Sequence, residues 1–130
     1  MTSRPDPGLS GGGAAAATSC AIEERRVGEI SVVSVAGTVD MLTAPQLEEA
    51  IGAAAKNSPP AVVVDLSAVE FLASAGMGVL VAAHDELSPE VRLVVVADGP
   101  ATSRPLKLVG IADVVDLHAT LDEALTALTT

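Results

Sequence analysis

Residues 64–84 read VDLSAVEFLASAGMGVLVAAH, and this stretch decides the fold. It continues the apolar run AVVVDL at 61–66, which is typical of a strand covered on both faces. Small residues follow around Ser74, and the segment 76–87 then has apolar residues at helical spacing. We therefore expect a buried strand, a short turn and an amphipathic helix. That helix would bury Val79, Leu80, Ala83 and Leu87 on one face.

Strands and helices alternate on both sides of this stretch. Upstream, strands at 21–26 and 29–37 flank a hairpin turn at Val27–Gly28. A helix over 43–56 follows, with Thr43 as its N-cap and Gln46 as the reciprocal partner in a capping box. Downstream we expect a strand at 91–97, a short helix at 103–111 closed by Gly110, a strand at 114–118, and a helix at 120–130 capped by Thr120 and Glu123.

The predicted order is ββαβαβαβα. Strands joined through helices run parallel with right-handed crossovers, so helices pack against a mostly parallel sheet of four to five strands. A chain of 130 residues suits one α/β domain, which we place at 21–130. Residues 1–20 are rich in Gly, Ala, Pro and Ser, and are predicted to form a disordered tail.

The chain is strongly acidic, with 17 Asp and Glu against 7 Lys and Arg and a net charge of −10. Such a surface repels the phosphates of nucleic acids and of anionic lipids, so neither nucleic acid nor membrane is an expected partner. A protein partner with a basic face is favoured instead. Because no apolar run is long enough to span a bilayer and the start does not read as a secretion signal, we expect a cytoplasmic protein.

The single cysteine, Cys20, excludes an intramolecular disulfide and a cysteine-based zinc cage. We interpret it as an inert thiol, with a redox-sensing or dimer-forming thiol as the alternative. The sequence also contains no cluster of metal-ligating residues, so no metal or cofactor is predicted.

Enzymatic roles for Ser74 find little support. A nucleophilic serine needs a base within about 2.6–3.2 Å, whereas His84 lies about 15 Å away along the same predicted helix. The sequence around Ser74, ASAGMG, lacks the Gly-x-Ser-x-Gly pattern of a nucleophile elbow. It also lacks the Lys-Ser/Thr that follows the glycines of a phosphate-binding loop. We therefore predict that the chain is not an enzyme.

Two compatible roles remain for Ser74. Its hydroxyl can cap the helix that follows, or it can accept a phosphate that is held by the free N–H groups and the positive end of the helix dipole. A phosphate adds nearly two negative charges. The small neighbours Ala73, Ala75 and Gly76 leave the hydroxyl open to a kinase. Three loops, at 37–43, 70–76 and 98–104, are expected to share the sheet edge at which Ser74 lies.

The segment 62–84, VVVDLSAVEFLASAGMGVLVAAH, resembles the central part of STAS domains, specifically of bacterial anti-sigma factor antagonists. The segment 35–51, VAGTVDMLTAPQLEEAI, resembles the "G-E-L-D-x-x-T-A-x-x-L" stretch of that family, and the likeness extends over about 21–128. The resemblance implies a STAS fold and a switch protein without catalysis. In this family the unphosphorylated antagonist binds an anti-sigma factor, often a serine kinase, and so frees the sigma factor. The kinase phosphorylates a loop serine, and a separate phosphatase reverses this.

Two departures of the loop from the family pattern "D-S-S-G-L-G" matter for function. Ala73 replaces the Asp, and Ala75 replaces the second Ser, which is the usual phosphate acceptor. Ser74 matches the first Ser. Three possibilities follow: Ser74 is the acceptor, the loop is never phosphorylated, or control lies elsewhere, at Thr38, Thr43 or the tail. Asp40 matches the acid that the family has before the first helix.

We accordingly expect an anti-sigma factor antagonist that works by partner switching. The alternative is a STAS scaffold or a ligand-sensing subunit of a stress-signalling complex. Asp40 is expected to orient its loop or to meet a basic residue of the partner. Ser74 is the phosphorylation candidate, and the predicted partner-binding residues are Thr38, Asp40, Met41, Thr43, Ala73, Ser74, Ala75, Gly76 and Met77.

Overall fold

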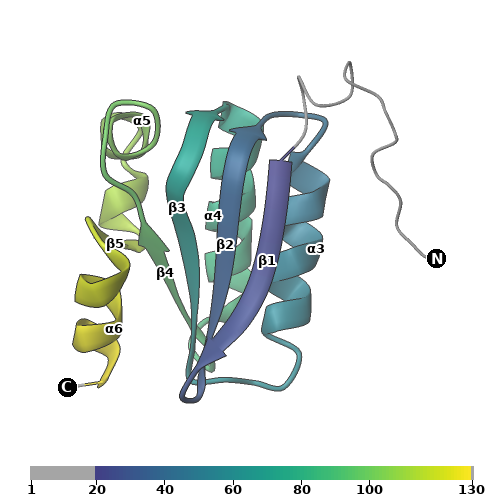
Figure 1. Cartoon of the computed structure of the whole chain (residues 1–130), viewed down its shortest axis with the longest axis vertical. Helices are drawn as coiled ribbons and strands as arrows, with labels where there is room; N and C mark the ends of the chain where they lie inside the picture. The colour runs from purple at the N-terminus through teal and green to yellow at the C-terminus, as the bar shows by residue number, and fades with distance from the viewer. Residues whose placement is uncertain (1–19, 130) are drawn as a thin grey trace.

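The computed structural model describes residues 20–129, and its strands and helices follow the predicted order (Figure 1). The predicted tail therefore lies outside the described residues, except for Cys20, where the first strand begins. The elements are β1 (Cys20–Val27), β2 (Ile30–Val39), α3 (Ala44–Ala54), β3 (Ala61–Leu72), α4 (Ser74–Leu87), β4 (Arg92–Val96), α5 (Ser103–Leu108), the 3₁₀ helix η1 (Ile111–Asp113), β5 (Asp116–His118) and α6 (Leu121–Thr129).

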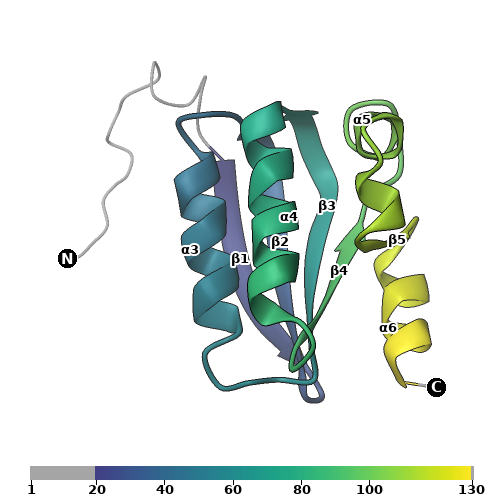
Figure 2. The same ribbon diagram turned by 180° about the vertical axis from the view of Figure 1, so that it is seen from behind.

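The five strands form one sheet in the order β1-β2-β3-β4-β5. Only β1 is antiparallel to its neighbour, since a hairpin joins it to β2, and the other pairs are parallel because helices connect them. Helices α3 and α4 cover one face of the sheet, as Figure 2 shows, and α6 lies against the other face. The parallel strands therefore end together at the edge where α3 and α4 begin.

The core has two parts, one on each face of the sheet. The larger part packs α3 and α4 against β2, β3 and β4, with Leu47, Ile51 and Leu80 fully buried. The smaller part packs α6 against the opposite face, around Val32 and Val63. Burial on both faces explains the continuous valine runs of the central strands. Aliphatic side chains fill both parts, because the only aromatic residue, Phe71, is exposed.

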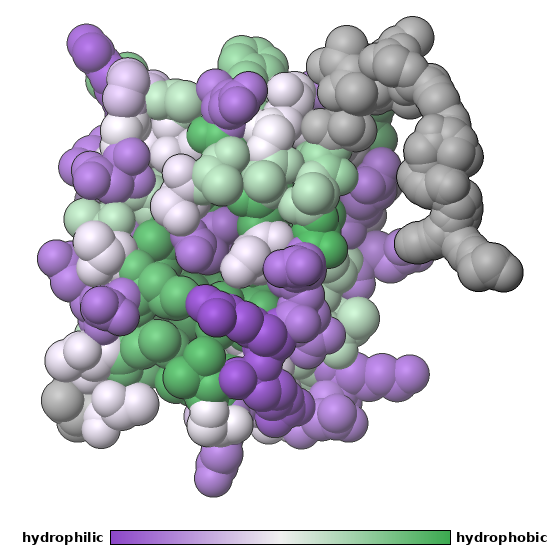
Figure 3. Space-filling model, viewed as in Figure 1, coloured by the Kyte–Doolittle hydropathy of each residue, from purple (hydrophilic) through white to green (hydrophobic). Residues whose placement is uncertain are grey.

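The face that carries α6 is only partly covered. Figure 3 shows hydrophobic surface low on this face, beside hydrophilic side chains. Where α6 ends near the β1–β2 hairpin, a hollow of about 440 Å³ is lined by Val27, Ile30, Ala61 and Leu128 among others. Among residues 20–129, no helix has both the length and the apolar character that crossing a bilayer requires.

Strand β3 is longer than predicted, because it continues past Leu66 to Leu72. Its pairing with β2 shifts between Ser34 and Ala36 and again between Gly37 and Thr38. At each shift β3 takes up an extra residue, as in a β-bulge. The bulges break the simple alternation of buried and exposed side chains along β3. The stretch at 70–76, which we expected to be a loop, is thus mostly strand and helix.

The hairpin turn lies one residue later than predicted. Val27 pairs with Ile30, so the two-residue turn is Gly28–Glu29. Gly28 has a φ of 63°, a left-handed conformation that glycine adopts at little cost and that tight hairpins require.

Candidate functional site

The candidate site lies at the sheet edge where β2 and β3 end and α3 and α4 begin (Figure 1). The N–H of Ala73 donates a hydrogen bond of 2.8 Å to the carbonyl of Val39, and this bond ties the two strand ends together. The loop after β2 and the first turn of α4 therefore form one surface, as predicted. The third loop, after β4, instead lines a separate cavity beside β5.

Asp40 and Thr43 hold the loop after β2 in a closed turn. The Asp40 carboxylate accepts hydrogen bonds from the N–H of Leu42 (2.9 Å) and the N–H of Thr43 (3.1 Å). The Thr43 hydroxyl accepts from the Asp40 N–H (2.9 Å) and donates toward the Thr38 carbonyl (2.9 Å). These bonds fit the first predicted role of Asp40, which is to orient this loop, and its contact with a basic residue of the partner stays a prediction.

Thr43 occupies the N-cap position of α3 as predicted, but the predicted capping box is wrong. Its side chain makes no hydrogen bond to the helix, because the hydroxyl points back toward β2. The side chain of Gln46 lies instead near the Cys20 sulfur, with 3.9 Å between Oε1 and Sγ. Thr43 is only 2% exposed, so it supports the loop from its buried side.

The tip of this loop presents apolar side chains to solvent. Met41 is 77% exposed and Leu42 is 68% exposed, and neither belongs to the core clusters. Large exposed apolar side chains on a supported loop are typical of a protein–protein contact.

Ser74 is the first residue of α4, and the prediction that it is the N-cap is wrong. Ala73 holds that position, with an extended backbone (φ −84°, ψ 167°) and no side-chain cap. The reason is tertiary, because β3 continues to Leu72 and the Ala73 N–H is used by Val39. The Ser74 side chain is exposed, and its hydroxyl has no hydrogen-bond partner among the described residues.

Two free backbone donors lie at Ser74. In the first turn of α4, the N–H groups of Gly76 and Met77 donate to the Ala73 carbonyl, whereas those of Ser74 and Ala75 have no acceptor among the described residues. The first N–H groups of a helix have no acceptor within it, and they lie at the positive end of the helix dipole. A negatively charged group on Ser74 would therefore be well placed.

The remaining predicted partner-binding residues divide by burial. Gly76 is buried against the sheet, and a Cβ atom there would lie 2.5 Å from Val39 Cγ1. Gly76 and Thr43 therefore position the surface and do not form part of it. Met77 packs partly against the larger core. Met41 and Ser74 are exposed, and Thr38, Asp40, Ala73, Ala75 and Met77 are half-buried.

Our interpretation of the sequence missed Phe71. It pairs with Thr38 near the end of β3 and is 55% exposed. It therefore adds an aromatic side chain at the same sheet edge. A signal was available, because Phe71 is the single aromatic residue of the chain and it immediately follows the charged Glu70.

The two histidines do not form a catalytic pair with Ser74. His84 lies in the last turn of α4, at the opposite end of the helix, and His118 ends β5. The Nδ1 atom of His84 is buried and has no hydrogen-bond partner within residues 20–129. Across the same residues, no three His, Cys, Asp or Glu side chains come together in a way that would hold a metal ion.

Comparison with known proteins gives consistent relatives. The profile of the STAS domain family matches residues 21–124. The chain is 44% identical over 97 residues to the anti-sigma-F factor antagonist RsfB of Mycobacterium tuberculosis, which covers 75% of this chain and 80% of that protein. It is 50% identical to an anti-sigma factor antagonist of known crystal structure from Mycobacterium paratuberculosis. That match has a TM-score of 0.83 and covers 86% of this chain and 96% of the other. The fold is also shared by an anti-sigma factor antagonist (STAS) domain protein from Planctomyces limnophilus, which is 22% identical. Its TM-score is 0.73, and the match covers 83% of this chain and 97% of the other.

Proposed function

The chain belongs to the STAS domain family, and we propose that it acts as an anti-sigma factor antagonist that frees a sigma factor by partner switching. The observation that carries this is the joined surface at the ends of β2 and β3. There the exposed side chains of Met41 and Leu42 lie on a loop that hydrogen bonds hold in place. The similarity to two mycobacterial antagonists, at 44% and 50% identity, supports the same function.

The proposed partner is an anti-sigma factor, and the names of the relatives point to an anti-sigma-F factor. Apolar side chains at the loop tip would supply the buried centre of the contact, since a few large side chains carry most of the affinity of such interfaces. The acidic surface of this chain would meet a basic rim on the partner.

We further propose that Ser74 is the regulatory phosphorylation site and that the anti-sigma factor is of the serine kinase type, with a phosphatase to reverse the reaction. Burial favours Ser74 over the two threonines of the loop after β2. Thr43 is 2% exposed and its hydroxyl is hydrogen-bonded, and Thr38 is half-buried, whereas Ser74 is exposed. A phosphate on Ser74 would accept hydrogen bonds from the free N–H groups at the start of α4. It would also place nearly two charges within the apolar contact.

In this proposal the chain is a regulator without enzymatic activity. It acts in the cytoplasm, where sigma factors associate with RNA polymerase, and it needs no nucleic acid or membrane of its own. The alternative function, a scaffold or ligand-sensing subunit, finds one supporting observation in the cavity beside β5.

The experiment is calorimetric titration of the anti-sigma-F factor of the same organism with wild type, Ser74→Ala, Ser74→Glu and Ala82→Glu. Ala82 is exposed on the same helix, two turns further on, so its variant adds the same charge away from the site. We expect wild type, Ser74→Ala and Ala82→Glu to bind alike. Ser74→Glu should lose about 2 kcal/mol or more, the cost of a disrupted interface centre.

Each other outcome has a defined meaning. Equal binding by all four forms would keep the antagonist and reject Ser74 as its switch. Failure of every form to bind would reject the antagonist in favour of the scaffold. Incubation of the wild type with the partner and ATP, followed by mass spectrometry, tests the kinase directly, and Ser74→Ala should then carry no phosphate.

A further inference from the structure

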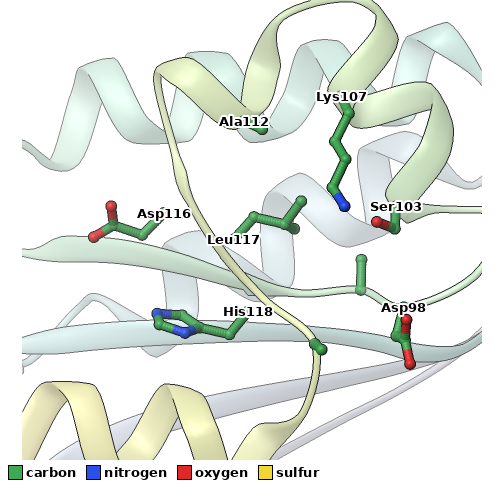
Figure 4. A pocket seen from close by; sticks show the side chains of 9 residues that line it. Asp98, Ser103, Lys107, Ala112, Asp116, Leu117 and His118 are labelled. Carbon is green, nitrogen blue, oxygen red and sulfur yellow. The ribbon is translucent and has the colours of Figure 1, made fainter.

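A cavity of about 370 Å³ lies at the carboxyl ends of β4 and β5, under α5 (Figure 4). Its size falls in the range of small-molecule sites. Its place is also where open α/β sheets usually bind ligands. The Ala97 N–H donates to the His118 carbonyl at 2.9 Å, so the two strand ends that form the floor are fixed together. No residue of the surface around Ser74 lines it.

Ser103 is the first feature that points to a ligand. Only 8% of the residue is exposed, and Figure 4 shows its hydroxyl directed into the cavity. Within residues 20–129 that hydroxyl has no hydrogen-bond partner. The hydroxyl opens onto the cavity and is therefore free to donate to, or accept from, a molecule bound there.

Lys107 is the second feature. It follows Ser103 by one turn of α5, so both side chains lie on the same side of the helix. Figure 4 shows its ammonium group pointing into the cavity beside Ser103. Lys107 is exposed at the cavity mouth, and among the described residues its ammonium group has no ion-pair partner. An ammonium group and a hydroxyl that converge in this way form a site for a small oxyanion.

The opposite wall limits the charge of that ligand. Asp98 lines the cavity at the end of β4, and its carboxylate would repel a multiply charged anion but accept a hydrogen bond from an amino or hydroxyl group. The other acid, Asp116, is already paired with Arg92. Apolar groups, including Leu117 and Ala112, complete the lining.

We propose that this cavity binds a small monocarboxylate that carries an amino or hydroxyl group. The carboxylate would contact Lys107 and Ser103, and the amino or hydroxyl group would contact Asp98. The inference does not depend on the antagonist function, because none of these residues belongs to the surface around Ser74.

The test is an NMR titration of the full-length protein with 2-amino and 2-hydroxy monocarboxylates, with inorganic phosphate as the other source of an oxyanion. We expect saturable shifts of the Ser103, Lys107 and His118 amide signals with at least one monocarboxylate. Lys107→Met and Ser103→Ala should each weaken that binding by about tenfold or more, which corresponds to ~1.4 kcal/mol. Lys56→Met, at an exposed lysine just after α3, is the matched control and should bind like wild type.

Three results would overturn the proposal. One is the absence of saturable shifts at the cavity with every monocarboxylate at millimolar concentration. Another is equal binding by wild type and Lys107→Met, whose folding is checked by its own spectrum. The third is saturable binding of phosphate alone, which would assign the cavity to a different class of ligand.

Discussion

Gly76 is the residue that lets α4 approach the sheet. A side chain there would place its Cβ 2.5 Å from Val39 Cγ1 and 2.8 Å from Leu72 Cδ1, closer than packed atoms allow. Both neighbours are core side chains of β2 and β3. The position of Ser74, two residues earlier, therefore depends on the missing side chain of Gly76.

Gly76→Ala should lower the free energy of unfolding by about 1–3 kcal/mol, the usual cost of overpacking. Gly78→Ala is the matched control, because Gly78 lies exposed in the same helix with nothing within 4 Å of an added Cβ. It should raise the stability by about 0.5–1 kcal/mol through helix propensity. Urea unfolding measures both, and equal effects of the two substitutions would contradict the close approach.

Thr43 holds the loop after β2 through its hydroxyl. Thr43→Val keeps the shape but leaves the Asp40 N–H and the Thr38 carbonyl without their partner. We expect a loss of about 1–3 kcal/mol in the free energy of unfolding. Thr43→Ser retains the hydroxyl and should cost clearly less. If the two variants are equally stable in urea, the hydroxyl does not support the loop.

At the scale of the element, the bulged end of β3 places two neighbouring residues in opposite environments. Leu72 is buried in the larger core, whereas Phe71 is 55% exposed at the sheet edge. One strand end therefore anchors the start of α4 and also presents an aromatic side chain to solvent. The bulges are the device that brings this end into place.

Phe71→Ala should weaken binding to the anti-sigma factor by about 1–2 kcal/mol, in the range of an aromatic contact residue, while changing stability by less than about 0.5 kcal/mol. Leu72→Ala should instead lower the free energy of unfolding by about 2–5 kcal/mol, because it opens a cavity in the core. Calorimetric binding and urea unfolding on both variants separate the two roles. Unchanged binding by Phe71→Ala would remove Phe71 from the contact surface.

At the scale of the whole molecule, the net charge of −10 governs encounter with the partner. Like charges over a small domain create a long-range field, which steers a basic partner toward it and is screened by salt. We expect the association rate constant to fall by about tenfold between about 0.05 M and 0.5 M NaCl. The dissociation rate should change far less.

Stopped-flow mixing with the anti-sigma factor measures both rate constants. Repeating the series with Ser74→Ala provides a control that leaves the charge unchanged. An association rate that does not respond to salt would show that the partner lacks the expected basic face.

Local pattern was sufficient for much of this architecture. The valine runs at 61–66 and 91–97 predicted two-sided strands, because burial on both faces favours a nearly continuous apolar run over alternation. Thr120 was predicted to cap the last helix, and its hydroxyl does accept from the Glu123 N–H at 3.1 Å. These features depend on neighbours within a few residues, so periodicity and cap chemistry reveal them.

Other features depend on contacts between residues that are far apart in the chain, and only the folded molecule decided them. The Thr43 hydroxyl points toward β2. Ala73, and not Ser74, occupies the N-cap position of α4, because the Ala73 N–H donates to the Val39 carbonyl. Phe71 reached the sheet edge through bulges that pairing with β2 imposes. The cavity under α5 forms where this helix lies over the carboxyl ends of β4 and β5. Local pattern cannot encode such arrangements, because the sequence separation of the contacting groups hides which of them will meet.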